Sequence, residues 1–252
     1  MIAALSAENI APALGGIDVR VMDTVDSTNS EAKRLLASFD GPFLITSEEQ
    51  TGGRGRQGRD FYSPRGSGIY MTLVIHPNST IADAVSVTTR ASVAVCRAIR
   101  TCTELAPQIK WVNDIYLGGK KICGILVEAI SDFAAGVTKS LVIGVGVNVT
   151  TAVFPDLPQA GALGTADLDR NRLIAEIVRE LLAVTEDLRD ASYLADYRAW
   201  SMVLGAHITY TENGETREAQ ALEIDAHGGL LVQHPDGSRK TLQSGEITLR
   251  VQ

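Results

Sequence analysis

The hydrophobic and polar positions divide this chain into two parts with different periodicities. In the first part, apolar runs that are typical of buried strands alternate with stretches of helical spacing. The strand-like runs are 41–49, 68–75, 109–130 and 140–149, and Gly118-Gly119 interrupts the third, which therefore predicts two strands joined by a turn. Helical spacing covers 26–39, 82–105 (with Val85 on the apolar face) and 169–190.

The pattern changes after about residue 205. Short alternating strands follow, separated by Asn213-Gly214, Gly228-Gly229 and Asp236-Gly237. Asn-Gly and Asp-Gly are strong signals for tight hairpins. We therefore predict an α+β protein, in which a mixed α/β domain with a central mixed sheet flanked by helices spans 1–204. A compact β-barrel then spans 205–252.

The first predicted helix has an expected start signal. Thr28 stands before the apolar stripe and Glu31 follows three residues later, which is the spacing of a capping box. Thr28 is therefore the predicted N-cap residue.

Composition limits the function classes. The 252 residues are 45% apolar and carry a formal net charge of −7, which suits a soluble globular protein and disfavours general nucleic-acid binding. No apolar run reaches the roughly 18 residues that span a bilayer. The N-terminus lacks a basic region and carries Glu8, so a secretory signal is not expected. Cys96, Cys102 and Cys123 have no metal-ligand spacing, and we expect reduced thiols in a cytoplasmic protein.

Residues 48–68, which we call the Gly–Arg loop, concentrate arginine and glycine in an acidic protein. Gly53, Gly55 and Gly58 match the dinucleotide-binding pattern G-x-G-x-x-G, but Pro64 and a strand follow where that pattern needs a helix. The phosphate loop with its Gly-Lys-Ser/Thr ending is absent, and the net charge disfavours an arginine-rich RNA-binding segment. A solvated loop with paired arginines remains open on these residues alone.

Five motifs in order narrow the choice. They are STN at 27–29, GRGRQGR at 53–59, KWVNDIYL at 110–117, KKICGILVE at 120–128 and GVGVNV at 144–149. Together they resemble the biotin protein ligase family, from about residue 20 to the C-terminal SGEITLR. Val112 stands where the family usually has proline, which puts the rigidity of that turn in doubt. The chain before DSTNS is too short for the N-terminal winged helix of some members, so we expect the monofunctional form.

The resemblance implies an α/β catalytic domain with a C-terminal barrel of the Src-homology-3 type. It also implies a reaction in two steps: biotin and ATP give biotinyl-5′-AMP and pyrophosphate, and a lysine of a biotin carboxyl carrier domain then displaces AMP. We expect Arg54 and Arg56 to neutralise phosphates, with Gly55 allowing close backbone approach. Lys121 would hold the biotin carboxylate or the α-phosphate. Mg²⁺ is expected with ATP, bound chiefly by phosphates because no dense carboxylate cluster or other protein metal site is visible.

The uncharged urea of biotin needs short neutral polar groups, which Ser27, Thr28, Asn29 and Gln50 supply. The residues expected to bind biotin are Ser27, Thr28, Asn29, Gln50, Gly53, Arg54, Gly55, Arg56 and Lys121. Those expected to bind nucleotide are Arg54, Arg56, Lys110, Lys121, Asn148 and Arg250. Arg56, Lys110, Asp114 and Lys121 are the expected catalytic residues, with Asp114 taking or steering the proton of the acceptor lysine. Glu246 and Arg250 resemble residues that link the small domain to the nucleotide.

Two alternatives remain. A lipoate or octanoate protein ligase shares the catalytic architecture, although GRGRQGR and KWVND favour biotin. A non-catalytic biotin sensor would need neither Lys121 nor Asp114. The sequence leaves open whether the protein is a monomer or a homodimer, and no membrane partner is expected.

No DNA partner is expected either, since this sequence carries net negative charge and shows no helix-turn-helix. A gel-shift experiment with the upstream DNA, biotin and ATP should show no complex below about 1 μM protein. A specific complex at lower concentration would contradict this expectation.

Overall fold

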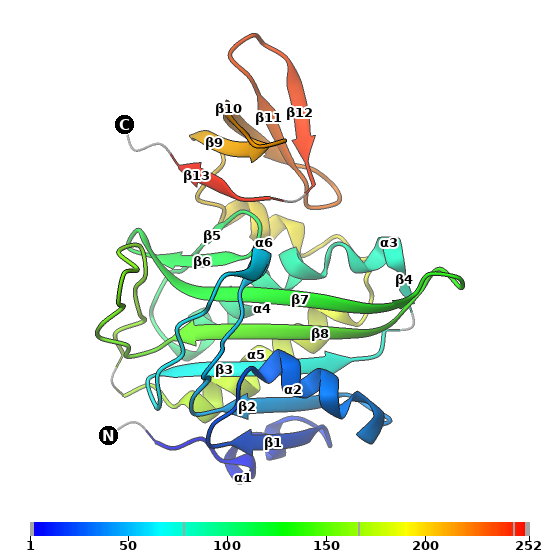
Figure 1. Cartoon of the computed structure of the whole chain (residues 1–252), viewed down its shortest axis with the longest axis vertical. Coiled ribbons are helices and arrows are strands. Elements are labelled where there is room, and N and C mark those ends of the chain that lie inside the picture. The colour runs from blue at the N-terminus through cyan, green and yellow to red at the C-terminus, as the bar shows by residue number, and fades with distance from the viewer. Residues whose placement is uncertain (1–2, 78, 166, 244, 250–252) are drawn as a thin grey trace.

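The computed structural model describes residues 3–77, 79–165, 167–243 and 245–249. Its larger sheet has eight strands, seven of them in the order β1-β2-β3-β8-β7-β6-β5, with β4 paired to β8 (Figure 1). The pair β1–β2 is parallel and the other neighbours are antiparallel, so the predicted mixed sheet is confirmed. The strands are β1 (Asp18–Met22), β2 (Phe43–Ser47), β3 (Gly68–Ile75), β4 (Ser79–Thr80), β5 (Gln108–Lys110), β6 (Asp114–Leu117), β7 (Lys120–Asp132) and β8 (Val137–Asn148).

Helices cover both faces of this sheet. The long helices α4 and α5 pack against each other and against one face, whereas α2 lies on the opposite face (Figure 1). The helices are α1 (Ala7–Ile10), α2 (Thr28–Leu35), α3 (Ile81–Ala84), α4 (Val87–Cys102), α5 (Arg170–Thr185) and α6 (Leu194–Ala199). Single 3₁₀ turns add η1 (Ala11–Ala13), η2 (Leu36–Ser38) and η3 (Arg56–Gly58).

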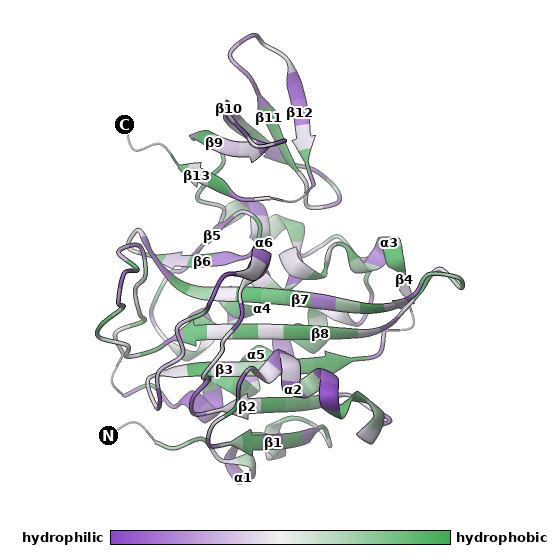
Figure 2. Cartoon of the chain, viewed as in Figure 1, coloured by the Kyte–Doolittle hydropathy of each residue, from purple (hydrophilic) through white to green (hydrophobic). Residues whose placement is uncertain are grey.

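The central strands are apolar over much of their length, as Figure 2 shows for β2, β3 and β8, whereas β7 also carries charged residues such as Glu128. Every residue of β2 and β3 is buried, because helices or the Gly–Arg loop cover both faces. Continuous apolar runs are the expected sequence of strands buried on both sides. No helix within the described part of the chain combines the length and the apolar character that crossing a membrane requires.

The second sheet is antiparallel, with the order β12-β11-β10-β9-β13. Its strands are β9 (His207–Glu212), β10 (Glu215–Ile224), β11 (Leu230–Gln233), β12 (Arg239–Leu242) and β13 (Ile247–Leu249). Each predicted Gly-containing turn joins two of these strands, with Gly214, Gly228 and Gly237 at positive φ. The predicted α+β fold class is confirmed, while the boundary at 204/205 stays a prediction.

The small β module is docked through the turn between β10 and β11. The indole Nε1 of Trp111 donates to the Gly228 carbonyl over 3.0 Å. Arg198 donates to the Ile224 and Asp225 carbonyls at 2.9 and 3.2 Å. Because Trp111 belongs to the KWVND motif, the module contacts the segment that carries the predicted chemistry.

The turn at Val112 is held by tertiary contacts. Its carbonyl accepts hydrogen bonds from Tyr197 Oη at 3.1 Å and Ser92 Oγ at 3.3 Å. The Trp111–Val112 peptide bond is cis. Hydrogen bonds from α4 and α6 therefore fix this turn without a proline at Val112.

Three details of the predicted helices are wrong. Ser27, not Thr28, is the N-cap of α2, and its side chain makes no capping hydrogen bond. Residues 82–105 form two helices, and Val85 between them is 62% exposed instead of lying on an apolar face. The predicted helix at 169–190 ends at Thr185. In the second and third cases, the helix ends or breaks where the helical spacing of apolar residues alone would continue it.

Candidate active site

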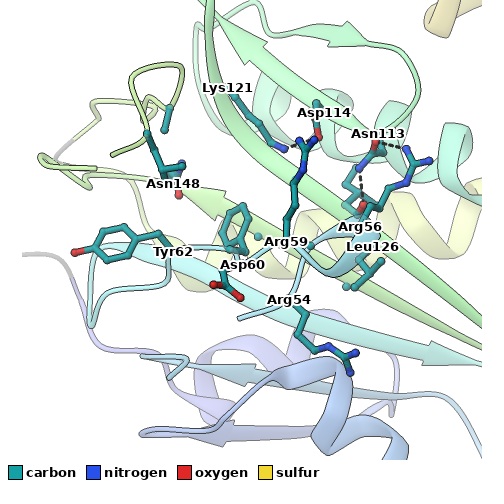
Figure 3. A pocket seen from close by; sticks show the side chains of 18 of the residues that line it. Arg54, Arg56, Arg59, Asp60, Tyr62, Asn113, Asp114, Lys121, Leu126 and Asn148 are labelled. Carbon is teal, nitrogen blue, oxygen red and sulfur yellow. Dashed lines mark hydrogen bonds and ion pairs between the residues drawn. The ribbon is translucent and has the colours of Figure 1, made fainter. Parts of the chain in front are cut away.

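A cavity of about 460 Å³ opens on the α2 face of the large sheet. Its walls come from the start of α2, the Gly–Arg loop, the glycine-rich parts of β7 and β8, the turn before β6, residues 154–160 and the segment leading into β13. Figure 3 shows several of these side chains from close by. This size suits a small-molecule ligand with a few polar anchors.

Most of the predicted site residues meet in this cavity. Those in its wall are Ser27, Thr28, Asn29, Gln50, Arg54, Gly55, Arg56, Lys110, Asp114, Lys121, Asn148 and Glu246. Gly53 lies beside the wall, where a Cβ atom would stand 2.3 Å from the Phe61 carbonyl oxygen. Arg250 lies outside the described residues.

The backbone and side chain of Thr28 are both hydrogen-bonded to a residue of the Gly–Arg loop. Its backbone N–H and its hydroxyl both donate to Gln50 Oε1, at 2.8 and 3.1 Å. Gln50 Nε2 donates to Ser63 Oγ at 2.8 Å, which fixes the Gln50 side chain. Thr28 was predicted as an N-cap, but its hydroxyl instead joins the start of α2 to the loop.

The Ser27 hydroxyl differs from its neighbour. Ser27 is 3% exposed and lines the cavity, and its hydroxyl has no hydrogen-bond partner among the described residues. The Ser27 Oγ atom is not among the buried unpaired atoms of the described residues, so it is accessible from the cavity that Ser27 lines. The Ser27 hydroxyl is therefore available to a neutral polar ligand, whereas the Thr28 hydroxyl is already bonded to Gln50.

Asn29 is held between strands and helix. Its Nδ2 donates to Glu128 Oε2 at 2.9 Å, and its Oδ1 accepts from Thr72 Oγ1 at 2.7 Å. Lys33 Nζ lies 2.6 Å from the other Glu128 oxygen. Burial opposes ionisation of Glu128, but the hydrogen bonds from Lys33 and Asn29 outweigh it and lower its pKa. Asn29 thus shapes the wall with its amide already satisfied.

Gly144 makes room for Asn29. A Cβ atom at position 144 would lie 2.1 Å from Asn29 Oδ1. We predict that Gly144→Ala lowers the free energy of unfolding by about 1–3 kcal/mol, because the overpacked amide must move. Urea denaturation measures this, with Gly41→Ala as the control, since Gly41 faces open space at an ordinary φ. Equal stability of the two variants would contradict the prediction.

The cavity is also lined by positively charged side chains, among them Lys121 and Lys110. Lys121 Nζ lies 2.7 Å from Asp114 Oδ1, and both side chains are partly exposed (Figure 3). Lys110 Nζ lies 5.5 Å from the centre of the Tyr116 ring, and burial lowers the pKa of Lys110. An anion bound here would offset the cost of burying these charges.

Arg56 is held by Asn113, and in Figure 3 its side chain lies beyond Asn113 as seen from the Lys121–Asp114 pair. Arg56 Nη1 donates to Asn113 Oδ1 at 2.7 Å, and Asn113 Nδ2 donates to the Ile125 carbonyl at 2.8 Å. The side chain of Arg54 points away from the Lys121–Asp114 pair in Figure 3. Arg56, Lys110, Asp114 and Lys121 therefore all line the cavity, but it is the side chain of Arg59 that lies next to the Lys121–Asp114 pair in Figure 3.

Asn148 ends β8 with one amide atom free. Its Nδ2 donates to the Gly161 carbonyl at 2.9 Å, whereas its buried Oδ1 has no partner among the described residues. A free acceptor in the wall of a cavity is suited to an amino group of a ligand.

Sequence reasoning missed several residues of the wall. Phe61 lies on the sheet, where a Cβ atom on Gly124 or Gly146 would stand 3.2 or 2.5 Å from its ring. Asn113 and Arg59 were also missed, and Arg59 forms an ion pair with Glu246 of the small module. The glycines inside two apolar strands were the available signal, because a strand glycine often marks a close approach.

A metal site made by the protein alone is not visible. The described residues contain no group of three or more His, Cys, Asp or Glu side chains that could hold an ion. The three cysteines are free thiols; Cys96 and Cys123 are buried and Cys102 is partly buried.

Comparisons with known proteins match both parts of the chain. Residues 21–148 match the biotin/lipoate A/B protein ligase family, and residues 203–250 match the biotin protein ligase C terminal domain. The biotin–[acetyl-CoA-carboxylase] ligase of Mycobacterium tuberculosis is 33% identical over 90% of this chain and 88% of its own length. The bifunctional ligase/repressor BirA of Escherichia coli is 29% identical over 98% of this chain and 78% of its own length.

Solved structures share the fold. The biotin protein ligase from Aquifex aeolicus in complex with biotin and ATP superposes with a TM-score of 0.76 at 24% identity, covering 92% of this chain and 98% of that one. The Leishmania major enzyme in complex with biotinyl-5-AMP has a TM-score of 0.64 at 23% identity, covering 89% and 98%. These likenesses support the α+β architecture with its small C-terminal barrel.

Proposed function

This chain belongs to the biotin protein ligase family and is an ATP-dependent biotin–protein ligase, and we propose how its residues divide the two steps of that reaction. One observation carries the assignment. A single cavity is lined both by neutral polar groups, among them Ser27 and Gln50, and by the cations Arg56, Lys110 and Lys121. That arrangement suits a molecule with an uncharged urea at one end and a carboxylate at the other.

In the first step, a carboxylate oxygen of biotin attacks the α-phosphorus of ATP. The bond from that phosphorus to the bridging oxygen breaks, and pyrophosphate leaves. We assign Arg56 and Lys121 to the carboxylate and the α-phosphate, and Lys110 to the phosphates. Fixed cations can stabilise the negative charge that these groups bring together.

We assign the urea of biotin to the other end of the cavity. The free Ser27 hydroxyl would meet one polar atom of the urea, while Thr28 and Gln50 hold each other in position beside it. Asn29 and Gly144 would define the depth of this end, and Gly53 would allow the loop backbone to approach. Arg54 would reach biotin or phosphate only after its side chain turns towards the cavity.

Asn148 is assigned to the adenosine. Its free Oδ1 can accept a hydrogen bond from an exocyclic amino group, such as that of adenine. Arg250 stays a predicted nucleotide contact, and Glu246 would act through its ion pair with Arg59 in the Gly–Arg loop.

Mg²⁺ belongs with ATP in this proposal. Magnesium is commonly held by one or two carboxylates together with substrate phosphates, which fits described residues that contain no group of three or more His, Cys, Asp or Glu side chains able to hold an ion. Asp114 is the carboxylate nearest the cations and could supply one oxygen. The ion would reduce repulsion between biotin and the polyphosphate.

In the second step, the amine of the acceptor lysine attacks the carbonyl carbon of the anhydride, and AMP leaves. Free lysine has a pKa of about 10.4, so losing the proton near pH 7 costs roughly 4.6 kcal/mol. We assign that proton to Asp114, and its 2.7 Å contact with Lys121, which we assign to the carboxylate and the α-phosphate, supports this role. The acceptor is a biotin-dependent carboxylase.

The deciding experiment is exchange of labelled pyrophosphate into ATP. Biotin should support exchange, and lipoate or octanoate at equal concentration should not. Exchange that is supported by lipoate but not by biotin would indicate a lipoate or octanoate protein ligase. Binding of biotin without any exchange would point to a non-catalytic sensor.

We predict that Arg56→Ala speeds the release of biotinyl-5′-AMP by roughly 10- to 100-fold. The variant loses a charge-assisted hydrogen-bond donor, whose removal costs roughly 1.5–3 kcal/mol. Stopped-flow fluorescence follows the release. Arg65→Ala is the matched control, because Arg65 lies in the same loop but pairs with Asp23 outside the cavity. An unchanged release rate in Arg56→Ala would show that Arg56 does not help to retain biotinyl-5′-AMP.

A further inference from the structure

Arg170, the first residue of α5, is a buried arginine outside the cavity. It is 1% exposed, and its guanidinium contacts Glu48 twice: Nη1 lies 2.9 Å from Oε2 and Nη2 lies 3.1 Å from Oε1. Nη1 also donates to the Gly68 carbonyl at 3.0 Å, and Nη2 to the Ala3 carbonyl at 2.9 Å. This two-pronged geometry is specific to guanidinium and carboxylate.

Two of these partners, Glu48 and Gly68, lie at the two ends of the Gly–Arg loop. Glu48 is the first residue of the loop and Gly68 is the last, so one guanidinium bonds both ends. The Glu48 backbone also joins the start of the loop to its end, because the Glu48 carbonyl accepts a hydrogen bond from the Gly66 N–H at 3.0 Å. Glu48 N–H donates to the Met22 carbonyl at 3.0 Å, which ties the loop start to β1.

The ends of the loop are connected to the cavity by a short path. Gln50, two residues after Glu48, donates its backbone N–H to the Ser63 carbonyl at 3.2 Å. Its side chain accepts from Thr28 and donates to Ser63 Oγ at 2.8 Å. A shift of Glu48 therefore moves Gln50 directly, whereas it reaches Arg56 along the chain through the seven intervening residues, 49–55, three of which are glycine.

We propose that Arg170 is a positioning residue that clamps both ends of the Gly–Arg loop and thereby sets the biotin end of the cavity. The proposal rests on the proposed function, since it assumes that Gln50 and Thr28 lie at the urea of biotin. A misplacement of about 1 Å can slow a reaction about 100-fold. A clamp two residues from Gln50 should therefore affect biotin more than ATP.

The chain contains a matched control. Arg90 in α4 is also buried, at 3% exposed, and donates to the Val184, Leu188 and Asp190 carbonyls at 2.8, 2.6 and 2.6 Å. Its partners join α4 to the end of α5, and none of its described contacts reaches the Gly–Arg loop. Replacing Arg90 therefore removes a comparable set of buried hydrogen bonds, but none of them involves a residue of the Gly–Arg loop.

The test compares Arg170→Lys with Arg90→Lys in the full chain. Lysine keeps the positive charge but cannot reproduce the forked hydrogen bonds. We expect both variants to lower the melting temperature. Only Arg170→Lys should raise the KM for biotin in pyrophosphate exchange, by roughly tenfold or more, with a KM for ATP that changes by less than about threefold. Release of biotinyl-5′-AMP should accelerate in the same variant alone.

Glu48→Gln provides a second measurement if Arg170→Lys fails to fold, since it keeps the size of the side chain and removes its charge. It should raise the KM for biotin in the same direction. Unchanged biotin affinity in either folded Arg170→Lys or Glu48→Gln overturns the clamp, as does an equal change in Arg90→Lys. Absence of biotin-dependent exchange in the wild-type chain would instead overturn the proposed function, and the clamp with it.

Discussion

Lys121→Met is expected to lower biotin-dependent pyrophosphate exchange about 1,000-fold, because the cation at the reacting centre is lost. The same change leaves Asp114 without its partner at 2.7 Å, facing the incoming carboxylate and phosphates. An uncompensated carboxylate there repels both substrates. Steady-state exchange at saturating ATP and biotin measures the loss, and single-turnover formation of the adenylate separates chemistry from binding.

Lys139→Met is the control for that substitution. Lys139 lies on β8 with its side chain 62% exposed, and it pairs with Asp132 away from the cavity. Exchange should stay within about twofold of the wild type, because an exposed ion pair contributes little. A Lys121→Met enzyme with near-normal exchange would show that Arg56 and Lys110 suffice, and would exclude Lys121 from the first step.

Asp114→Asn is expected to separate the two steps. Transfer to the acceptor lysine should slow about 100-fold, because the side chain can no longer take the proton of the attacking amine. Formation of the adenylate should slow less than about tenfold, since that step needs no proton acceptor. Rapid-quench experiments measure each step, with a purified carrier domain added to preformed enzyme–adenylate complex for the second.

The pH dependence provides an internal check on Asp114. Hydroxylamine or another amine that is neutral at the assay pH should react with the adenylate at similar rates in Asp114→Asn and the wild type. Lysine transfer by the variant should recover as pH rises towards the pKa of free lysine, near 10.4. Equal losses in both steps, without recovery at high pH, would place Asp114 in nucleotide or metal binding.

The architecture was largely predictable from the sequence because it depends on local spacing. Continuous apolar runs marked β2, β3 and β8, and β3 has the predicted bounds, Gly68–Ile75. Gly118 and Gly119 both have positive φ, which explains why this pair joins β6 to β7. The strand β1 and the helix α6 had no comparable signal: β1 is only partly buried and α6 has six residues.

The residue types at the site were also visible, but their partners were not. Ordered motifs led to most residues in the cavity wall. Asn113, which binds Arg56, stands in the KWVNDIYL motif but is not among the predicted site residues. A motif shows which side chains are present, whereas hydrogen-bond partners depend on which strands lie next to each other.

By itself, the sequence determined the periodic elements, the hairpin turns and the family, because each depends on residues close along the chain or on an ordered set of motifs. Only the tertiary structure decided that Thr28 bonds Gln50 and that Arg170 bonds Glu48, across 22 and 122 residues. The physical reason is that a polar side chain near a helix start satisfies whichever buried partner the fold brings within about 3 Å. Local spacing offered Thr28 a capping role, and the packing of the loop against α2 supplied a different partner.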